Sequence, residues 1–333
     1  MTFDAAVAVV EAARTPADLF GQTDPVRTYR RLSRLLHPDV APADRAATAT
    51  AAFARLAELW SGHEDGQAIT TARHRYVVAG PLGTDDPADL AQLYQVRYSG
   101  GEAVLKVARA PADNDLLARE AEALTRLGRD GDPRFRAYAP RLIETFTLED
   151  PVTGHRRRAN VQEHCAGFVS LARVASAFGD GVDPRDVAWI WRRLLVALGA
   201  AHRVGLVHGA VLAEHVLIHP DEHGLVLVDW CYATTQAGQH VPALVARDRD
   251  AYPPEVAARQ PATPATDLYL ASGLMLRMMG ALAHPALRRF AEGCRLAAPR
   301  LRPQDAWALL AELDGLLADL YGRRRFRPFA LPR

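Results

Sequence analysis

The order of local sequence patterns constrains the fold of this chain most strongly, because strand-like segments come early and helical segments come late. Short runs rich in β-branched and aromatic residues predict strands, and apolar residues three and four positions apart predict helices. The expected strands are Tyr76–Val78, Leu93–Tyr98, Ala103–Ala108, Leu142–Phe146, Ala159–Glu163, Val216–Ile218 and Leu225–Val228, and the clearest early helix is Leu116–Leu127. After Pro184 the chain is mainly helical, so this order predicts an α+β domain with two lobes.

The first 60 residues have a different pattern, which contains no strand-like run. A helix is expected over Asp24–Leu36, because Asp24 is a good N-cap and proline follows at the first helical position. Pro38 ends it, since proline cannot continue a helix. Its inward positions are expected to be Val26, Tyr29, Leu32, Ser33 and Leu36. A second amphipathic helix is expected over Asp44–Trp60, which makes this part a small all-α helical hairpin.

Four segments follow from these changes of pattern. We expect a helical module over 1–62, a polar linker over 63–75, a first lobe over 76–168 and a second lobe over 169–333. The chain ends in a basic and aromatic tail, GRRRFRPFALPR. Phe326 and Phe329 are expected to pack on the second lobe and leave the tail arginines in water; docking of an acidic partner or a nucleic acid is the alternative.

Charge and cysteine content exclude several broad classes. The 40 basic and 39 acidic residues give a net charge of +1, so the chain lacks the overall positive charge of many nucleic-acid-binding proteins. No apolar run is long enough to span a membrane, and the N-terminus lacks the basic start of a secretory signal. The three cysteines are far apart and suggest neither a disulfide framework nor a zinc site. We therefore expect a cytoplasmic protein.

The N-terminal segment YRRLSRLLHPD, followed by a loop and a helix containing AAFARLAELW, resembles a J domain. In that family a His-Pro-Asp tripeptide lies between two antiparallel helices, beside a basic helix face, and stimulates the ATPase of DnaK-type chaperones. The tripeptide here is His37, Pro38 and Asp39, and the basic face is Arg27, Arg30, Arg31 and Arg34. The resemblance therefore implies that these residues bind a DnaK-type heat-shock chaperone. A helical hairpin whose tripeptide merely caps a helix is the alternative.

Lysine usage singles out one position in the rest of the chain. Of the 40 basic residues 39 are arginine, and the only lysine is Lys106. Such a bias toward arginine is typical of a GC-rich genome, in which an indifferent basic position drifts to arginine. A retained lysine is therefore a candidate for a task that needs a compact charge on a thin stem.

Residues 76–320 resemble the protein-kinase fold through an ordered set of motifs. Ala103-Val104-Leu105-Lys106-Val107 is similar to the strand whose lysine pairs with nucleotide phosphates, and Glu120 is similar to that lysine's partner on the next helix. Glu163 and Cys165 lie where the family contacts adenine, and Gly80 and Gly83 begin what resembles its Gly-rich loop. Asp229, in LVLVDW, is similar to the metal-binding aspartate. The resemblance implies binding of ATP with Mg²⁺ or Mn²⁺.

Four further residues resemble structural positions of the same family. His208 begins the sequence similar to the catalytic loop, and Asp267 opens a helix similar to the central helix of the second lobe. Glu255, in YPPE, and Arg302 resemble the ion pair that anchors the activation segment. The resemblance implies that all four hold the fold rather than react.

Departures from the family pattern decide what the domain is expected to do. Ala210 stands where the family has the aspartate that accepts the hydroxyl proton, and His215 stands where an asparagine would bind the second metal ion. Histidine is a poor ligand for Mg²⁺ but can bind Mn²⁺ or Zn²⁺. The segment Thr84-Asp85-Asp86-Pro87-Ala88-Asp89 is acidic where a phosphate cradle needs glycine. Glu214 or Asp221 could replace the missing base, although their spacing favours neither.

We therefore expect a nucleotide-binding pseudokinase joined to a J-domain-like module, acting as a regulatory adaptor or co-chaperone. One alternative is an atypical phosphotransferase or nucleotidyl transferase that uses Lys106, Glu120 and Asp229. The His-Gly and Asp-Trp pairs also resemble the aminoglycoside and choline kinases. Those kinases need an aspartate at the position of Ala210, so the same base is missing. A scaffold that binds no nucleotide is the remaining alternative.

Overall fold

A computed structural model describes residues 1–333 except 22–23, 42, 67, 84–88, 150–152 and 333. The protein is a mixed α+β structure, as the sequence predicts. It divides into two compact units. The first unit comprises residues 1–80 and 94–102, and the second unit comprises residues 81–93 and 103–333. The acidic residues Asp85 and Asp86 lie outside the described residues.

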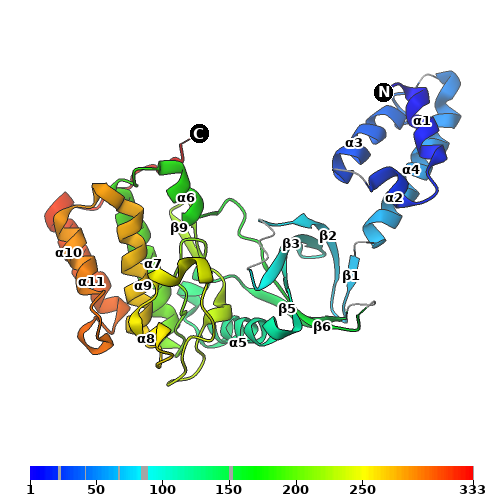
Figure 1. Cartoon of the computed structure of the whole chain (residues 1–333). Helices are drawn as coiled ribbons and strands as arrows, with labels where there is room; N and C mark the ends of the chain where they lie inside the picture. The colour runs from blue at the N-terminus through cyan, green and yellow to red at the C-terminus, as the bar shows by residue number, and fades with distance from the viewer. Residues whose placement is uncertain (22–23, 42, 67, 84–88, 150–152, 333) are drawn as a thin grey trace. The chain divides into compact units, whose positions relative to one another are not determined.

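The first unit begins with a group of helices, which Figure 1 draws in blue. These are α1 (Phe3–Ala12), α2 (Pro16–Phe20), α3 (Pro25–Leu36) and α4 (Ala46–Gly66). The two expected helices are confirmed as α3 and α4, and the Asp24 side chain accepts a hydrogen bond from the backbone N of Arg27 at 2.9 Å. Leu32 and Leu36 are buried as expected, whereas Val26 is 38% exposed and its predicted inward position is wrong. Val26 lies in the first turn of α3, whereas the buried residues Leu32 and Leu36 lie in its last two turns.

The strands that the sequence predicts are confirmed, with small shifts at their ends. They are β2 (Arg75–Pro81), β3 (Ala91–Tyr98), β4 (Gly101–Ala108), β5 (Leu142–Glu149), β6 (Arg156–Glu163), β8 (Val216–His219) and β9 (Gly224–Leu227). Two short strands were not predicted, β1 (Ala68–Thr70) and β7 (Val169–Ser170). The larger sheet has the order β1-β2-β3-β4-β6-β5, and the smaller sheet has the order β7-β8-β9.

Register within the larger sheet determines which side chains meet. Strand β4 pairs antiparallel with β6, with Lys106 opposite Asn160 and Ala103 opposite Glu163. The expected helix is confirmed as α5 (Asn114–Asp130), and it buries Leu117, Glu120 and Leu124. A buried glutamate on this helix needs a partner, because an unpaired charge is costly to remove from water.

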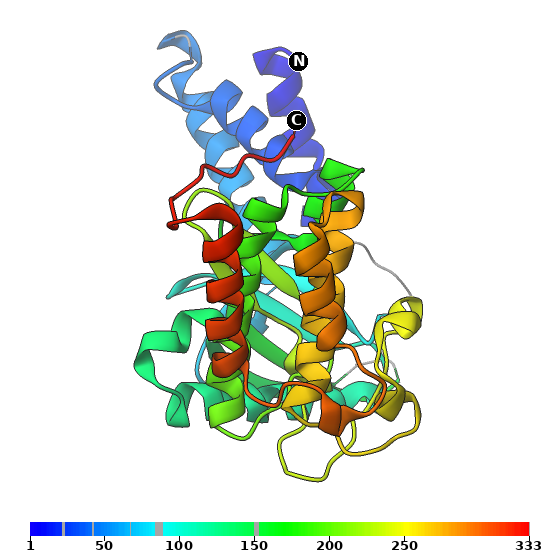
Figure 2. The same cartoon turned by 90° about the vertical axis from the view of Figure 1, so that its left-hand side faces the viewer.

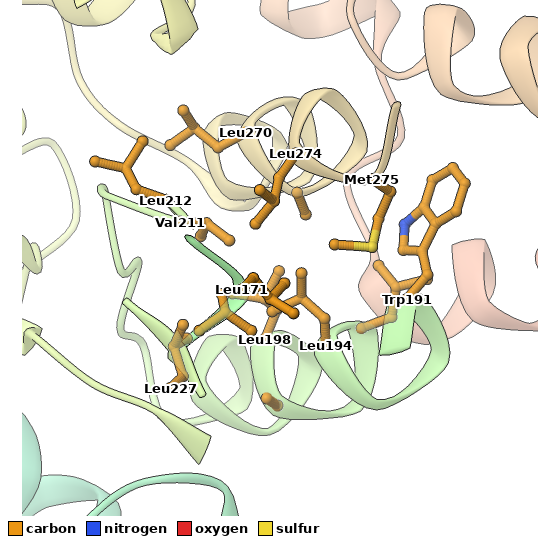
Figure 3. Packing of buried hydrophobic residues seen from close by; sticks show 14 of the residues in the cluster. Leu171, Trp191, Leu194, Leu198, Val211, Leu212, Leu227, Leu270, Leu274 and Met275 are labelled. Carbon is orange, nitrogen blue, oxygen red and sulfur yellow. The ribbon is translucent and has the colours of Figure 1, made fainter. Parts of the chain in front are cut away.

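The rest of the second unit is mainly helical. Its helices are α6 (Leu171–Phe178), α7 (Pro184–Arg203), α8 (Pro254–Ala257), α9 (Pro264–Met279), α10 (Pro285–Gly293) and α11 (Ala306–Tyr321). Short 3₁₀ helices include η4 (Trp230–Tyr232) and η5 (Ala246–Ala251). Figure 3 shows Leu194 and Leu198 of α7 facing Leu274 and Met275 of α9, and all four side chains are buried. This apolar core supports the loops that carry the candidate site. Over the residues that the structure describes, no helix is both long and apolar enough to cross a membrane.

Candidate functional site

Lys106 is the centre of a buried polar cluster in the second unit. Its side chain projects from β4 and the residue is only 6% exposed. The ammonium Nζ lies 3.0 Å from Glu120 Oε1 and 3.1 Å from Cys231 Sγ, and it also forms an ion pair with Asp229 Oδ1. A lysine ammonium has three hydrogens to donate, so these three partners satisfy it. Burial alone lowers the pKa of Lys106, but Asp229, Cys231 and Glu120 outweigh it and hold the pKa well above its usual value.

The ion pair expected between Lys106 and Glu120 is therefore present. Glu120 is completely buried on α5, and its second oxygen, Oε2, accepts a hydrogen bond from Asn160 Nδ2 at 2.9 Å. The same amide nitrogen donates to the carbonyl of Leu117 at 2.9 Å, which ties α5 to β6. Sequence reasoning missed Asn160, because the predicted strand Ala159–Glu163 also contains Gln162 and Glu163 and gives Asn160 no special signal. Its position opposite Lys106 in the ladder explains why a polar residue is tolerated there.

Asp229 lies two residues after the end of β9, in a left-handed backbone conformation with φ of 68°. Its Oδ1 faces Lys106, and its Oδ2 lies 3.0 Å from His215 Nε2. Burial raises the pKa of Asp229, but Lys106 and His215 together lower it well below its usual value. Both carboxylate oxygens of this aspartate are thus already engaged by basic groups.

His215 is the second basic partner of Asp229. Its other ring nitrogen, Nδ1, lies 2.8 Å from the carbonyl of Ala210, so both nitrogens face acceptors. Burial lowers the pKa of His215, whereas the Asp229 carboxylate and the Ala210 carbonyl raise it, and the net shift is upward. The geometry therefore fits a protonated imidazole that donates through both nitrogens. Its ring also stacks on Tyr232, at 5.6 Å between centroids.

The loop before β8 is fixed by Asp267, which is completely buried near the start of α9. Asp267 accepts hydrogen bonds from the backbone N atoms of His208 and Gly209, both at 2.8 Å, and lies 2.9 Å from His202 Nε2. His208 Nε2 contacts the carbonyl of Val228 at 2.9 Å, and burial lowers the pKa of His208 to about 4. This loop holds Ala210 in a buried position, where its methyl group offers no proton acceptor.

The second expected ion pair is also present. Arg302 Nη1 lies 2.7 Å from Glu255 Oε1, and Arg302 Nη2 lies 2.9 Å from Glu255 Oε2. Both residues are buried, and the hydroxyl of Thr266 donates to the same glutamate at 3.1 Å. This bidentate contact joins α8 to the segment before α11.

A scan of the sequence against protein-family models finds no matching family, and a search of curated proteins finds no matching relative. Functional assignment therefore depends on the geometry of the site itself.

Sequence reasoning missed a group of ion pairs around Arg247. Arg247, on η5, lies 2.9 Å from Asp89 Oδ1 and also forms an ion pair with Glu214. Glu214, which the sequence offered as a replacement base, is thus engaged by a guanidinium. Asp221, the other candidate, lies exposed in the turn between β8 and β9. Neither carboxylate is held at Ala210 by any hydrogen bond in the described residues.

The donor set around Asp229 does not fit a magnesium centre. Ligand atoms of Glu120, Asp229 and Cys231 lie within 4.8 Å of one another, but Lys106 Nζ already contacts all three residues. The lysine ammonium thus takes the position that a cation would occupy in such a set. A second Mg²⁺ ion fits less well still, because His215 presents a nitrogen that is engaged by Asp229.

Four further residues are predicted to contact a nucleotide: Gly80, Gly83, Glu163 and Cys165. Gly80 ends β2 with Pro81, and Gly83 follows in a left-handed conformation with φ of 81°. Glu163 ends β6, three pairs along the β4–β6 ladder from Lys106, which is about 10 Å in a strand. Cys165 follows in the connection to β7, where burial and the nearby Glu163 raise its pKa to about 11. A thiol with this pKa is inert at neutral pH.

The predicted chaperone-binding residues belong to the first unit. His37 is exposed at the end of α3, its Nδ1 accepts a hydrogen bond from the backbone N of Asp39 at 3.3 Å, and its ring lies against Phe53. Asp39 is exposed and Pro38 is half-buried between them. The four arginines of the basic face, Arg27, Arg30, Arg31 and Arg34, are exposed on α3.

Proposed function

We propose that residues 76–333 form a kinase-like domain that binds a nucleotide without efficient phosphoryl transfer. We further propose that the helical module before it recruits a DnaK-type chaperone in the cytoplasm. The chain would then act as an adaptor whose state depends on nucleotide. The observation that carries this proposal is the set of contacts at Asp229, whose carboxylate is held between Lys106 and His215.

The missing base supports a non-catalytic function. Ala210 offers no acceptor for a hydroxyl proton, and general-base assistance is worth about 10²–10⁴-fold in rate. Phosphoryl transfer depends mainly on positioning and on neutralising charge, usually by metal ions. Here the aspartate expected to hold a metal ion is already engaged by two basic groups. Two requirements for efficient transfer are therefore weakened at once.

The buried lysine supports nucleotide binding. Glu120 holds the Lys106 ammonium from one side, and Asp229 is its partially exposed partner on the other side, with a side chain 27% exposed. A nucleotide phosphate could replace Asp229 as the acceptor without disturbing the pair with Glu120. Charge-assisted hydrogen bonds of this type are about twice as strong as neutral ones. Asp229 immediately precedes η4, so its release from Lys106 would link nucleotide binding to the position of η4.

Thermal melting with ATP tests this proposal, with MgCl₂, with MnCl₂ and without a metal ion. The adaptor predicts an upward shift of the melting midpoint and no transfer of labelled phosphate to the protein or to a generic substrate. No shift under any condition would favour the scaffold that binds no nucleotide. Transfer at ordinary kinase rates that Asp229→Asn abolishes would establish the enzyme alternative instead.

A second experiment tests the helical module. We predict that the full chain stimulates the ATPase of a cognate DnaK-type chaperone and that His37→Gln abolishes the stimulation. Because His37 is exposed, the variant should keep the stability of the parent. Val40→Ala is the matched control, since Val40 lies in the same loop and is 71% exposed. Stimulation that survives His37→Gln would contradict the chaperone function of the tripeptide.

A further inference from the structure

A cavity of about 590 Å³ lies in the second unit, outside the cluster around Lys106. It is formed by α7, the end of α11 and the segment that follows α11. Figure 2 shows this C-terminal segment in red as it leaves α11. Ligand cavities for small molecules usually measure about 300–1,000 Å³. The cavity therefore has the size of a small-molecule site rather than of a groove for a polymer.

One part of the cavity lining is apolar. Ala188 of α7 and Leu317 and Ala318 of α11 line it. Trp189 also lines it and stacks on His223, with ring centroids 4.0 Å apart and ring planes 8° apart. Phe326 continues this stack at 4.5 Å from His223, although 67% of Phe326 is exposed. The predicted packing of the tail is thus present for both rings: Phe329 is buried, whereas Phe326 packs on His223 with one side and stays largely exposed.

The other part of the lining is strongly basic. The arginines at the cavity are Arg185, Arg192, Arg323, Arg324, Arg325 and Arg327. Asp314 pairs with Arg192, and Asp183 and Asp186 pair with Arg327. In the described chain no carboxylate is placed in an ion pair with Arg323, Arg324 or Arg325. The cavity therefore carries more positive than negative charge.

The charge excess changes the pKa values of neighbouring groups. Burial lowers the pKa of Arg192, and the nearby charges of Arg324 and Arg193 lower it further. Burial also lowers the pKa of His223. A hydrogen bond with the backbone of Arg327 opposes this shift, and the charges of Arg193 and Arg324 add to it. In both cases the surrounding positive charge disfavours the protonated form of the side chain. A bound anion would offset this positive charge.

Two buried nitrogen atoms of residues at the cavity have no hydrogen-bond partner among the described residues. Trp189 is only 7% exposed, and no hydrogen-bond acceptor contacts its indole Nε1 within the described part of the structure. His223 is 6% exposed, and its Nε2 likewise has no hydrogen-bond partner among the described residues. An unsatisfied buried donor or acceptor costs about 1–3 kcal/mol, and native proteins seldom leave one without a function. Both residues line the cavity through other atoms, because these two nitrogen atoms are shielded from solvent.

We propose that this cavity binds a small organic phosphate. The phosphate group would be held by Arg323, Arg324 and Arg325, whose planar guanidinium groups match its oxygens. The carbon body of the ligand would lie against Ala188 and Leu317. This site is independent of the nucleotide proposed at Lys106, because the two share no lining residue.

Calorimetric titration of the full chain tests the proposal with three probes: phenyl phosphate, glucose 6-phosphate and inorganic phosphate. We expect at least one organic phosphate to bind about tenfold more tightly than inorganic phosphate, because its carbon body adds apolar contact worth about one factor of ten. Phenyl phosphate as the tighter probe would identify an aromatic body, and glucose 6-phosphate would identify a sugar. Equal affinity for all three probes, or no binding at millimolar concentration, would overturn the proposal.

Two pairs of variants locate the binding. Arg323→Glu/Arg324→Glu reverses two exposed charges at the cavity, and Arg289→Glu/Arg300→Glu reverses two exposed charges elsewhere. Ala318→Trp fills the cavity mouth without changing charge, and Ala311→Trp adds the same bulk elsewhere on α11. Each cavity variant should weaken binding of the organic phosphate at least tenfold, and each control should change it less than twofold. Unchanged binding in folded cavity variants, or equal losses in the controls, would contradict the site.

Discussion

At the scale of single residues, Lys106 compensates two acidic groups. Lys106→Met would leave the buried Glu120 carboxylate with the amide of Asn160 as its remaining polar contact among the described residues. Removing one partner of a buried ion pair costs about 3–5 kcal/mol. We therefore predict a loss of this size in the free energy of unfolding, measured with urea. The double variant Lys106→Met/Glu120→Gln should recover part of it, because no uncompensated charge remains on α5. A single variant as stable as the parent would contradict the account.

His208 makes stability depend on pH. Burial lowers its pKa in the folded protein to about 4 from the ordinary value of 6.5, so the folded state binds the proton less well than the unfolded chain. The stabilisation is complete above pH 6.5 and is lost as the pH falls toward 4. Between pH 7 and pH 5 this loss is about 2 kcal/mol. His208→Gln, which keeps a donor for the carbonyl of Val228, should show a correspondingly smaller loss in urea titrations. Equal losses in both proteins would refute this assignment.

At the scale of elements, the loop between α7 and β8 depends on the backbone of Gly209. Its φ is 77°, and a Cβ there would lie 2.7 Å from the carbonyl oxygen of Tyr232. Gly205 has φ of 76° but open space around it, which makes it a matched control. We predict that Gly205→Ala costs about 1 kcal/mol from backbone strain alone. Gly209→Ala should cost about 2–4 kcal/mol because the contact adds to the strain. Equal unfolding midpoints for the two variants would contradict the predicted contact.

Elements and site residues differ in how far the sequence predicts them. Local periodicity is enough for α3, α5 and the strands from β2 to β9, except for the two-residue strand β7, whose sequence gives too short a pattern. Motif spacing predicts the contact between Lys106 and Glu120, because Lys106 lies on one strand and Glu120 on the helix that follows it. The contacts of Arg247 with Asp89 and Glu214 join segments 158 and 33 residues apart. No local pattern encodes such contacts, since they depend on how distant loops pack.

At the scale of the whole molecule, apolar residues gather in two separate cores. One core contains Leu32, Leu36 and Leu56 of the first unit, and the other contains Leu194 and Leu198 of the second. The cores share no residue, and each side chain named here is at most 1% exposed. Because cooperative unfolding follows shared packing, the core of the N-terminal helices should have a thermal transition separate from that of the core around α7.

Calorimetry of matched variants tests this division. Leu56→Ala should cost about 2–5 kcal/mol in the first unit, since it leaves a cavity in a small helical core. In a unit of this size that loss lowers its transition by roughly 10 °C or more, and it should leave the second transition in place. Leu198→Ala should have the converse effect, lowering only the transition of the unit that holds Lys106. If either variant shifts both transitions together, the two cores unfold as one and the second unit is not separable from the helical module. Two independent transitions would mean that the module keeps its exposed His37 loop folded whether or not the second unit binds a ligand.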